Sequence, residues 1–178
     1  VRRLRADALA RARHSADAPE RCVMERAFGH QNVSAKLLAA RIGSDEIHTT
    51  ETLGAGAFGE VRAALWRGQL VAVKRMHRHR ITDRDVEEAK RSAEVQLSLE
   101  AHPNIALLRG VAWSASSADF SLVMEFCCAG QTLLCLLSSD RPLRLLEHKL
   151  PIALGLARGV GFLHSQATPV LHRDLKPE

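Results

Sequence analysis

The chain has 178 residues, of which 46% are hydrophobic and 25% are charged, and its formal net charge is +5. This composition is typical of a globular protein and excludes a disordered tail. The most apolar stretch, residues 120–137, is interrupted by Glu125 and Gln131, which argues against a membrane span. The positive charge allows an anionic partner such as a nucleotide, but a charge of this size is common on ordinary domains.

The cysteines provide a second constraint. None of the four has the spacing of a metal site, and Cys127 and Cys128 are adjacent and poorly placed to share a ligand. We therefore expect a reduced, intracellular and cytoplasmic chain. No secretory signal is visible and the first residue is Val1, so both ends are expected to be cut ends. The other two cysteines are Cys22 and Cys135.

Residues 1–47 form the first of three regions. They are rich in alanine and arginine, and Leu4, Ala8 and Leu9 recur at helical spacing beside basic residues. The pattern predicts a helix with a basic face. Such a face could contact an acidic partner or nucleic acid, but a solvated flanking helix is the favoured interpretation.

Residues 48–126 change to short apolar runs separated by glycine, which predicts a sheet-rich region with one helix. Within "LGAGAFGEV", Gly54, Gly56 and Gly59 form the pattern G-x-G-x-x-G, where backbone N–H groups can approach phosphate oxygens closely. A dinucleotide fold would require a helix at the last glycine. Instead, alternating residues, the turn-like "RGQ" at 67–69 and the run "LVAV" predict a hairpin, although "RAAL" has helix propensity. The alternative to a phosphate-binding motif is that the three glycines are only turn residues of a hairpin.

A lysine follows the second strand of this hairpin. Lys74 ends a run whose other members are expected to be buried or half-buried, so it requires an anion such as a phosphate and one carboxylate. The carboxylate is expected on a helix over residues 82–101, which begins at a Thr82 cap. Glu94 is chosen over Glu87 and Glu88 because it lies nearest the apolar side of that helix.

Residues 127–178 have a helical pattern and end in a polar loop. One face of the second predicted helix carries Ile152, Leu156, Val160 and Leu163, and Pro151 fits near its start. The loop "VLHRDLKPE" then concentrates ionisable groups beside a proline, as expected of a loop built for chemistry. The ionisable residues before its proline are His172, Arg173, Asp174 and Lys176.

Five motifs in order resemble the protein kinase family: "GAGAFGEV", "VAVK", "HPNI" at 102–105, "LVMEF" at 122–126, and "LHRDLKPE". The resemblance covers residues 48–178 and implies an α+β, protein-kinase-like fold. It places a sheet-rich amino-terminal lobe with one main helix at 48–126 and the first helices of a helical lobe at 127–178, after a flanking segment at 1–47. "RDLKPE" resembles the serine/threonine type, and "LLRGVAW" at 107–113 resembles the tyrosine-kinase-like group.

The resemblance implies ATP as cofactor and assigns the residues that would bind it. Gly54, Gly56 and Gly59 would cover the phosphates, and Phe58 would shield them from water. The resemblance also assigns an apolar roof over adenine, a gatekeeper and a hinge. The roof would be formed by Leu53, Val61 and Ala72, the gatekeeper by Met124, and the hinge backbone by Glu125 and Cys127.

The resemblance also assigns the chemistry. Lys74 would bind the α- and β-phosphates and pair with Glu94, while Asp174 would accept the proton of the substrate hydroxyl. Lys176 would help to neutralise the transferred phosphoryl group. His102, His172 and Arg173 are expected to be structural. No metal ligand is assigned here, because the Mg²⁺ ligands of the family are expected downstream of residue 178.

The predicted function is therefore that of an ATP-dependent protein serine/threonine kinase, with ATP and a protein substrate as partners and no membrane. This segment alone is expected to be inactive. The alternative is a catalytically inactive, pseudokinase-like module that binds nucleotide or acts as a scaffold. A nucleic-acid binder that uses "KRMHRHR" at 74–80 is the weakest of the three hypotheses.

Overall fold

The computed structural model describes residues 33–56, 59–76, 82–114, 119–127, 132–139 and 143–177. The chain divides into two compact units. The first comprises the chain up to Glu100 together with Leu108–Phe126, and the second comprises Ala101–Leu107 and the chain from Cys127 onward. The predicted basic helix near the amino terminus lies outside the described residues.

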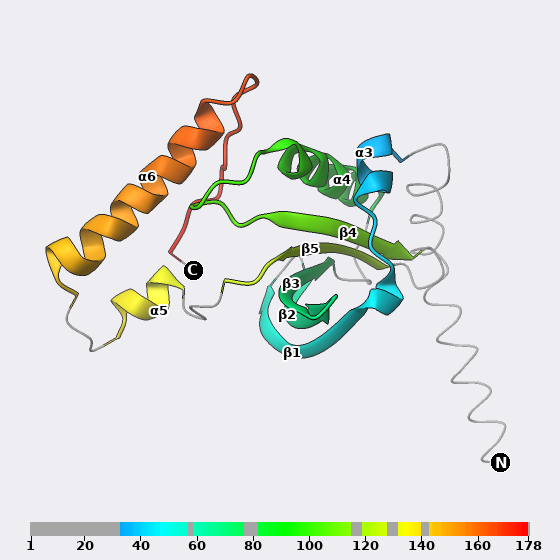
Figure 1. Ribbon diagram of the computed structural model, residues 1–178, viewed down its shortest axis with the longest axis horizontal. Helices are drawn as coiled ribbons and strands as arrows, with labels where there is room; N and C mark the ends of the chain where they lie inside the picture. Colours follow the sequence, from blue (N-terminus) through cyan, green and yellow to red (C-terminus); the bar gives the residue numbers. More distant parts are fainter. Residues whose placement is uncertain are drawn as a thin grey trace, which may run out of the picture. The chain divides into compact units, whose positions relative to one another are not determined.

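A five-stranded antiparallel sheet forms the centre of the first unit (Figure 1). Its spatial order is β1-β2-β3-β5-β4. This arrangement confirms the predicted α+β fold with a sheet-rich first lobe. The strands are β1 (Ile47–Gly56), β2 (Gly59–Trp66), β3 (Gln69–Met76), β4 (Leu108–Ser114) and β5 (Asp119–Glu125).

The predicted hairpin is formed by β2 and β3. The turn between them places Arg67 at φ 50° and Gly68 at φ 76°, the left-handed backbone that two-residue hairpin turns require. Ala63 and Ala64, within the "RAAL" stretch, are buried in β2. Burial between the two neighbouring strands therefore overrides the helix propensity of this stretch.

The main helix of the first unit is α4 (Asp83–Ser98), and it begins where the sequence predicts. The Thr82 hydroxyl accepts a hydrogen bond from the Asp85 amide, and the Asp85 carboxylate accepts one from the Thr82 amide. This reciprocal capping box satisfies amide groups that the first helical turn leaves unpaired. Val86 and Ala93 are buried on the apolar side of the helix.

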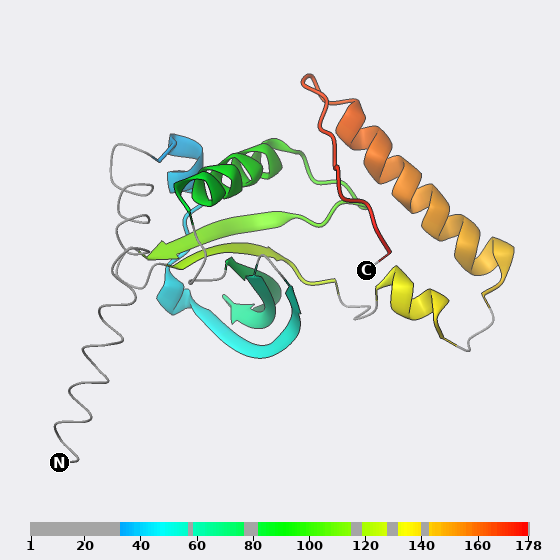
Figure 2. The same cartoon turned by 180° about the vertical axis from the view of Figure 1, so that it is seen from behind.

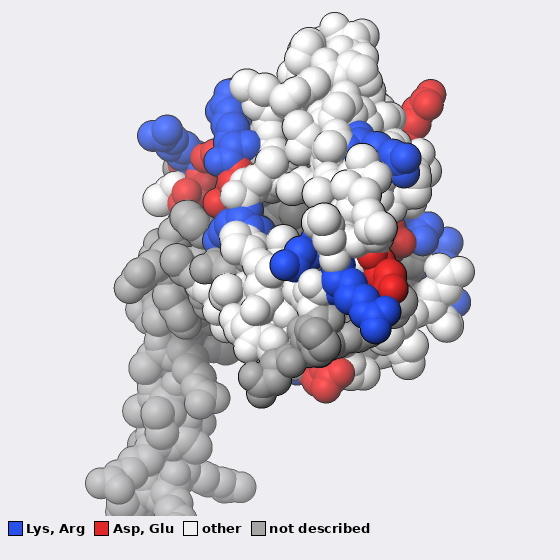
Figure 3. All heavy atoms as spheres, turned by 90° about the vertical axis from the view of Figure 1, so that its left-hand side faces the viewer, with Lys and Arg blue, Asp and Glu red and all other residues white. Residues whose placement is uncertain are grey.

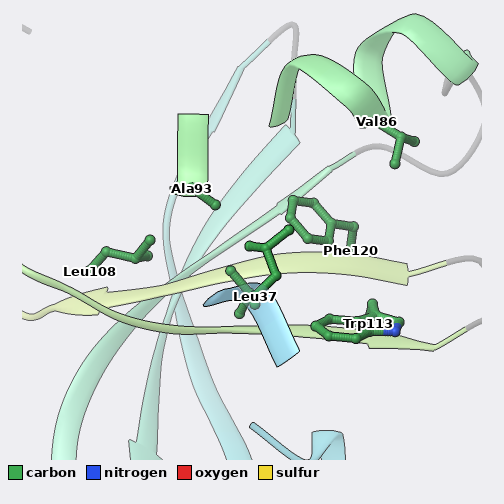
Figure 4. Close-up of a cluster of buried hydrophobic side chains, with 7 residues drawn as sticks. Leu37, Val86, Ala93, Leu108, Trp113 and Phe120 are labelled. Atoms are coloured by element: carbon green, nitrogen blue, oxygen red, sulfur yellow. The ribbon is translucent and has the colours of Figure 1, made fainter. Parts of the chain in front are cut away.

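Two apolar clusters cover the two faces of the sheet. The first lies between α4 and the strands, and Figure 4 shows Val86 and Ala93 of α4 above Phe120, with Leu37 beside it. The second lies on the opposite face and includes Val71, Val73 and Val123. The buried members of the first cluster are Leu37, Val86, Ala93, Leu108, Val111, Trp113 and Phe120.

A short segment before β1 packs on this unit. It contains α3 (Ala35–Ala39) and the 3₁₀ turn η1 (Ser44–Glu46), and both views of the fold show α3 beside α4 (Figures 1 and 2). Backbone hydrogen bonds join Ile42 to Val111 and Val111 to Ala40. Leu37 and Ile42, which fall within the predicted flanking segment at 1–47, are buried members of the two apolar clusters.

The second unit contains α5 (Leu133–Leu137), the π-helical turn η3 (Leu145–Lys149) and α6 (Leu150–His164). Pro151 lies in the first turn of α6, as predicted. Leu163 is buried, whereas Leu156 on the same predicted face is 51% exposed. Within the described ranges, no helix is both long and apolar enough to cross a membrane.

The "HPNI" motif packs against α6 within the second unit. The ring of His102 stacks on Phe162 with 4.6 Å between ring centroids, and its Nδ1 accepts a hydrogen bond from the Asn104 amide. A side chain at Gly159 would press on the Asn104 carbonyl, at 2.9 Å. These contacts show His102 holding the loop on the helix, which is a structural position.

Candidate nucleotide-binding and catalytic site

The three motif glycines lie where β1 turns into β2. Gly54 on β1 is paired with Val61, and Gly56 is paired with Gly59 at the start of β2. The motif is therefore part of a β-hairpin and does not lead into a helix, which excludes the dinucleotide arrangement. Phe58, predicted at the tip, lies outside the described residues.

The three glycines differ in whether packing within the protein leaves space for a side chain. A Cβ at Gly59 would collide with the carbonyl oxygen of Arg75 on the neighbouring strand. At Gly54 and Gly56, a Cβ would meet no described atom within 4 Å. Packing within the described chain therefore explains one glycine but not the other two, which leaves room for a ligand to approach the backbone.

Lys74 lies on β3, next to this hairpin. It is paired with Val61 of β2 on one side and with Leu122 of β5 on the other, so these residues share one sheet face. Lys74 is exposed, so burial does not oblige it to pair with an anion, and its phosphate and carboxylate partners stay a prediction. The run does bury Val71 and Val73, but they point to the opposite face, and a long lysine side chain can carry its amine to solvent.

Three of the residues predicted to contact adenine, Val61, Ala72 and Met124, lie on the same face as Lys74. Ala72 is paired with Met124, and both are half-buried, as is Val61. Leu53 is 46% exposed, so it is available to a ligand. Glu125 and Cys127, the two predicted hinge positions, are exposed. Their proposed contribution comes from backbone groups, which does not depend on how the side chains lie.

The acidic residues of α4 separate into distinct environments. Glu94 is half-buried, whereas Glu88 is exposed. Glu87 Oε1 lies 2.7 Å from Nζ of Lys90, a lysine that is only 6% exposed. Sequence reasoning missed this buried lysine, whose signal was its place on the apolar stripe one turn from Val86 and Ala93. Among the described residues, no ion pair joins Lys74 to Glu94, and their pairing stays a prediction.

The loop after α6 carries the predicted base. The Asp174 amide donates a hydrogen bond to Nδ1 of His172 at 3.3 Å, and Arg173 between them has a φ of 63°. Lys176 Nζ lies 3.8 Å from Oδ2 of Asp174, and the Asp174 side chain is 76% exposed. The loop thus presents a carboxylate and an amine side by side to solvent. Arg173 thus has a left-handed backbone conformation that few non-glycine residues adopt.

Backbone contacts hold both ends of this loop. The Val170 amide donates to the Leu163 carbonyl at 2.9 Å, and the Leu134 amide donates to the Pro177 carbonyl at 2.6 Å. The loop is thereby attached to α6 at one end and to α5 at the other. In the part of the chain that the structure describes, no group of three or more His, Cys, Asp or Glu side chains could hold a metal ion.

Charged side chains are mixed on the face shown in Figure 3, where lysine and arginine lie beside aspartate and glutamate. A nucleic-acid surface is expected to show a continuous basic stripe. Of the basic stretch at 74–80, the structure describes residues 74–76 only. This face offers no support for the nucleic-acid hypothesis.

Comparisons with known proteins agree with this geometry. The protein kinase domain family model matches residues 47–178. Mitogen-activated protein kinase kinase kinase 7 of Drosophila melanogaster is 36% identical over 142 residues, which cover 79% of this chain and 20% of that protein. Mitogen-activated protein kinase kinase kinase 11 of Homo sapiens is 36% identical over 133 residues, covering 74% of this chain and 15% of the relative.

A third relative is the seven transmembrane domain-containing tyrosine-protein kinase 1 of Dictyostelium discoideum, 35% identical over 164 residues. The match covers 83% of this chain and 23% of that protein. The chain thus spans less than a quarter of the length of each of these relatives. It belongs to the protein kinase family, as a serine/threonine-type sequence most like the tyrosine-kinase-like group.

Proposed function

We propose that the protein is an ATP-dependent protein kinase that transfers the γ-phosphoryl group of ATP to serine or threonine hydroxyls. One observation carries the proposal. The backbone at Gly54 and Gly56 is open on a hairpin that leads into β2, and Val61 of β2 is paired with the exposed Lys74. Backbone amides and an available amine on neighbouring strands are what a triphosphate needs for binding.

The adenine end of ATP fits the same sheet face. Leu53, Val61 and Ala72 supply apolar surface that is exposed or half-buried, and Met124 lies beside Ala72 in register. Ligand sites are mostly apolar with a few polar groups that fix orientation. Here the apolar residues would contact the base, and Lys74 would bind the α- and β-phosphates. Bound ATP supplies the phosphoryl group, together with the divalent cation that it carries.

The chemical step is assigned to the loop after α6. Asp174 would accept the proton from the substrate hydroxyl as the oxygen attacks, a contribution of about 10²- to 10⁴-fold in rate. Lys176, with Nζ 3.8 Å from the Asp174 carboxylate, would neutralise charge on the transferred group. Asp174 would thus take up a proton, while Lys176 would offset negative charge on the phosphoryl group.

The acceptor hydroxyl is proposed to be serine or threonine because Lys176 stands two residues after Asp174, as in the serine/threonine type. One relative carries the name of a tyrosine-protein kinase, so the acceptor is an explicit part of the test.

The experiment measures transfer of labelled phosphate from ATP to a generic basic protein by the full-length protein, followed by phosphoamino-acid analysis. Asp174→Asn is the test variant. Asp45→Asn is its matched control, because Asp45 is an exposed aspartate of the 3₁₀ turn η1, which belongs to the first unit.

We expect phosphoserine and phosphothreonine from the wild type and the control, and a loss of at least about a hundredfold in Asp174→Asn. Phosphotyrosine alone would overturn the acceptor assignment. Equal activity in Asp174→Asn would overturn the assignment of the base. Binding of ATP without transfer in the wild type would support the non-catalytic, nucleotide-binding alternative.

A further inference from the structure

Ser98, the last residue of α4, contacts both the segment before β1 and Glu94, which is the proposed partner of Lys74. The Ser98 hydroxyl donates a hydrogen bond to the Glu94 carbonyl at 2.7 Å. The same hydroxyl accepts a hydrogen bond from Nζ of Lys36 on α3. A serine hydroxyl has one donor and two acceptor sites, so both bonds can exist together. Lys36, Ser98 and the Glu94 backbone therefore form one chain of contacts.

The lysine in this chain stands on a firmly held helix. Leu37, the next residue, is fully buried and belongs to the cluster that contains Val86 and Ala93 of α4. The Ser34 hydroxyl caps α3 by accepting a hydrogen bond from the Leu37 amide. Figure 4 shows Leu37 directed into the side chains between α4 and the strands. A hydrogen bond from a charged donor such as the Lys36 ammonium group is stronger than one between two neutral groups.

The other end of α3 is attached to the sheet. The Ile42 amide donates to the Val111 carbonyl at 2.8 Å, and the Val111 amide donates to the Ala40 carbonyl at 3.0 Å. The guanidinium of Arg41 lies 4.6 Å from the centre of the Trp113 ring. The segment lies so close to β4 that a Cβ at Gly110 would collide with the Ala40 carbonyl and with Ile42. The segment thus links β4 directly to the last turn of α4.

This link bears on the reaction because α4 carries Glu94. The helix packs on the sheet through Val86 and Ala93, an apolar contact that permits small sliding and rotation. The Ser98 hydroxyl bonds to the backbone carbonyl of Glu94, and Lys36 bonds to the same hydroxyl, so the last turns of α4 are tied to α3 by a specific polar contact in addition to the apolar packing. Residues that orient a reacting group in this way can change rates when they shift by about 1 Å.

We propose that Ser98, held by Lys36, is a positioning residue that sets Glu94 for its pairing with Lys74. The proposal rests on the proposed kinase function. In this proposal residues 34–42 are more than a flanking segment, because they connect the sheet to α4, the helix that carries Glu94.

The experiment compares Ser98→Ala, Lys36→Met and the double variant in the full-length protein, with kcat and KM for ATP measured separately from KM for the protein substrate. Ser92→Ala is the matched control. Ser92 lies on the same helix and is also exposed, and among the described residues its hydroxyl accepts a local hydrogen bond from the Gln96 side chain. Lys36→Arg, which keeps the charge and the donor, tests rescue. Lys74→Met shows whether the proposed function itself holds.

We expect Ser98→Ala and Lys36→Met each to lower kcat/KM for ATP by about three- to tenfold, the scale of one hydrogen bond. The double variant is expected to be no worse than Ser98→Ala, because both substitutions break the same chain. KM for the protein substrate and the melting temperature should stay within the range of Ser92→Ala, and Lys36→Arg should restore most of the activity.

Failure of this inference is distinct from failure of the kinase assignment. If Lys74→Met abolishes transfer while Ser98→Ala and Lys36→Met behave like Ser92→Ala, the positioning role is wrong and the kinase function stands. Multiplicative losses in the double variant would show that the two residues act independently, and would also overturn the proposal. Full activity in Lys74→Met would remove the proposed function itself.

Discussion

Lys74 on β3 lies directly across from Val61 on β2, so the amine and one of the apolar residues proposed to contact adenine stand side by side on one sheet face. A nucleotide that contacts Val61 would bring its phosphates within reach of that lysine. The register of two strands therefore places a charged and an apolar side chain next to each other, where the proposed nucleotide would contact both.

The first prediction concerns this lysine. Lys74→Met should reduce phosphoryl transfer by at least about a hundredfold, because it removes the positive charge that positions the α- and β-phosphates. The melting temperature should stay unchanged, since Lys74 is exposed. Lys149→Met, at an exposed lysine of the second unit, is the control in the same transfer assay. Normal turnover in Lys74→Met would contradict the assignment.

The second prediction separates the acidic residues of α4. Glu94→Gln should lower activity far more than Glu88→Gln, which changes an exposed residue. Glu87→Gln should instead lower the free energy of unfolding, by about 0.5–1 kcal/mol, because it weakens the ion pair with Lys90 at a half-exposed site. Kinetics and denaturant unfolding of the three variants measure the two effects. Equal losses of activity in all three would refute the choice of Glu94.

The third prediction concerns the glycines. Gly59→Ala should destabilise the protein by about 1–3 kcal/mol, because its Cβ would meet the Arg75 carbonyl. Gly56→Ala meets no described atom and should leave stability nearly unchanged while weakening ATP binding. Thermal unfolding and titration with a fluorescent ATP analogue measure the two quantities. If both variants lose stability alike and bind nucleotide normally, the motif is a turn and not a phosphate cradle.

The fourth prediction concerns the cap of α4. The Asp85 carboxylate accepts hydrogen bonds from the Thr82 hydroxyl and from the Thr82 backbone amide. Both bonds hold the pKa of Asp85 below its ordinary value, and the hydroxyl has the larger effect. A lowered pKa in the folded state means that the ionised carboxylate contributes stability above the ordinary aspartate pKa of about 4. That contribution disappears as pH falls through the lowered value.

Denaturant unfolding at pH 7 and near pH 3 checks this prediction. Asp85→Asn should lose less stability than the wild type between the two pH values, and Thr82→Ala should cost about 1 kcal/mol at pH 7. An identical pH response in Asp85→Asn and the wild type would show that the carboxylate does not contribute.

Local sequence patterns determined much of the first unit. The alternation around Val61 and Val71 predicts the β2–β3 hairpin, and Thr82 predicts the start of α4; both are confirmed because strand period and helix capping depend on neighbouring residues. The order of five motifs identified the family, which the match over residues 47–178 confirms. The roles of Lys74, Glu94 and Asp174 stay predictions.

Only the tertiary structure decided how distant segments meet. No local pattern shows that Lys36 contacts Ser98, that Leu37 enters the core, or that Gly59 is fixed by Arg75 while Gly56 is not. The exposure of Lys74 also emerged only from the fold, because a run of apolar neighbours does not reveal which sheet face each residue joins. Contacts across long sequence separations depend on strand pairing and packing of the whole unit, and these are set by the fold and not by the neighbouring residues.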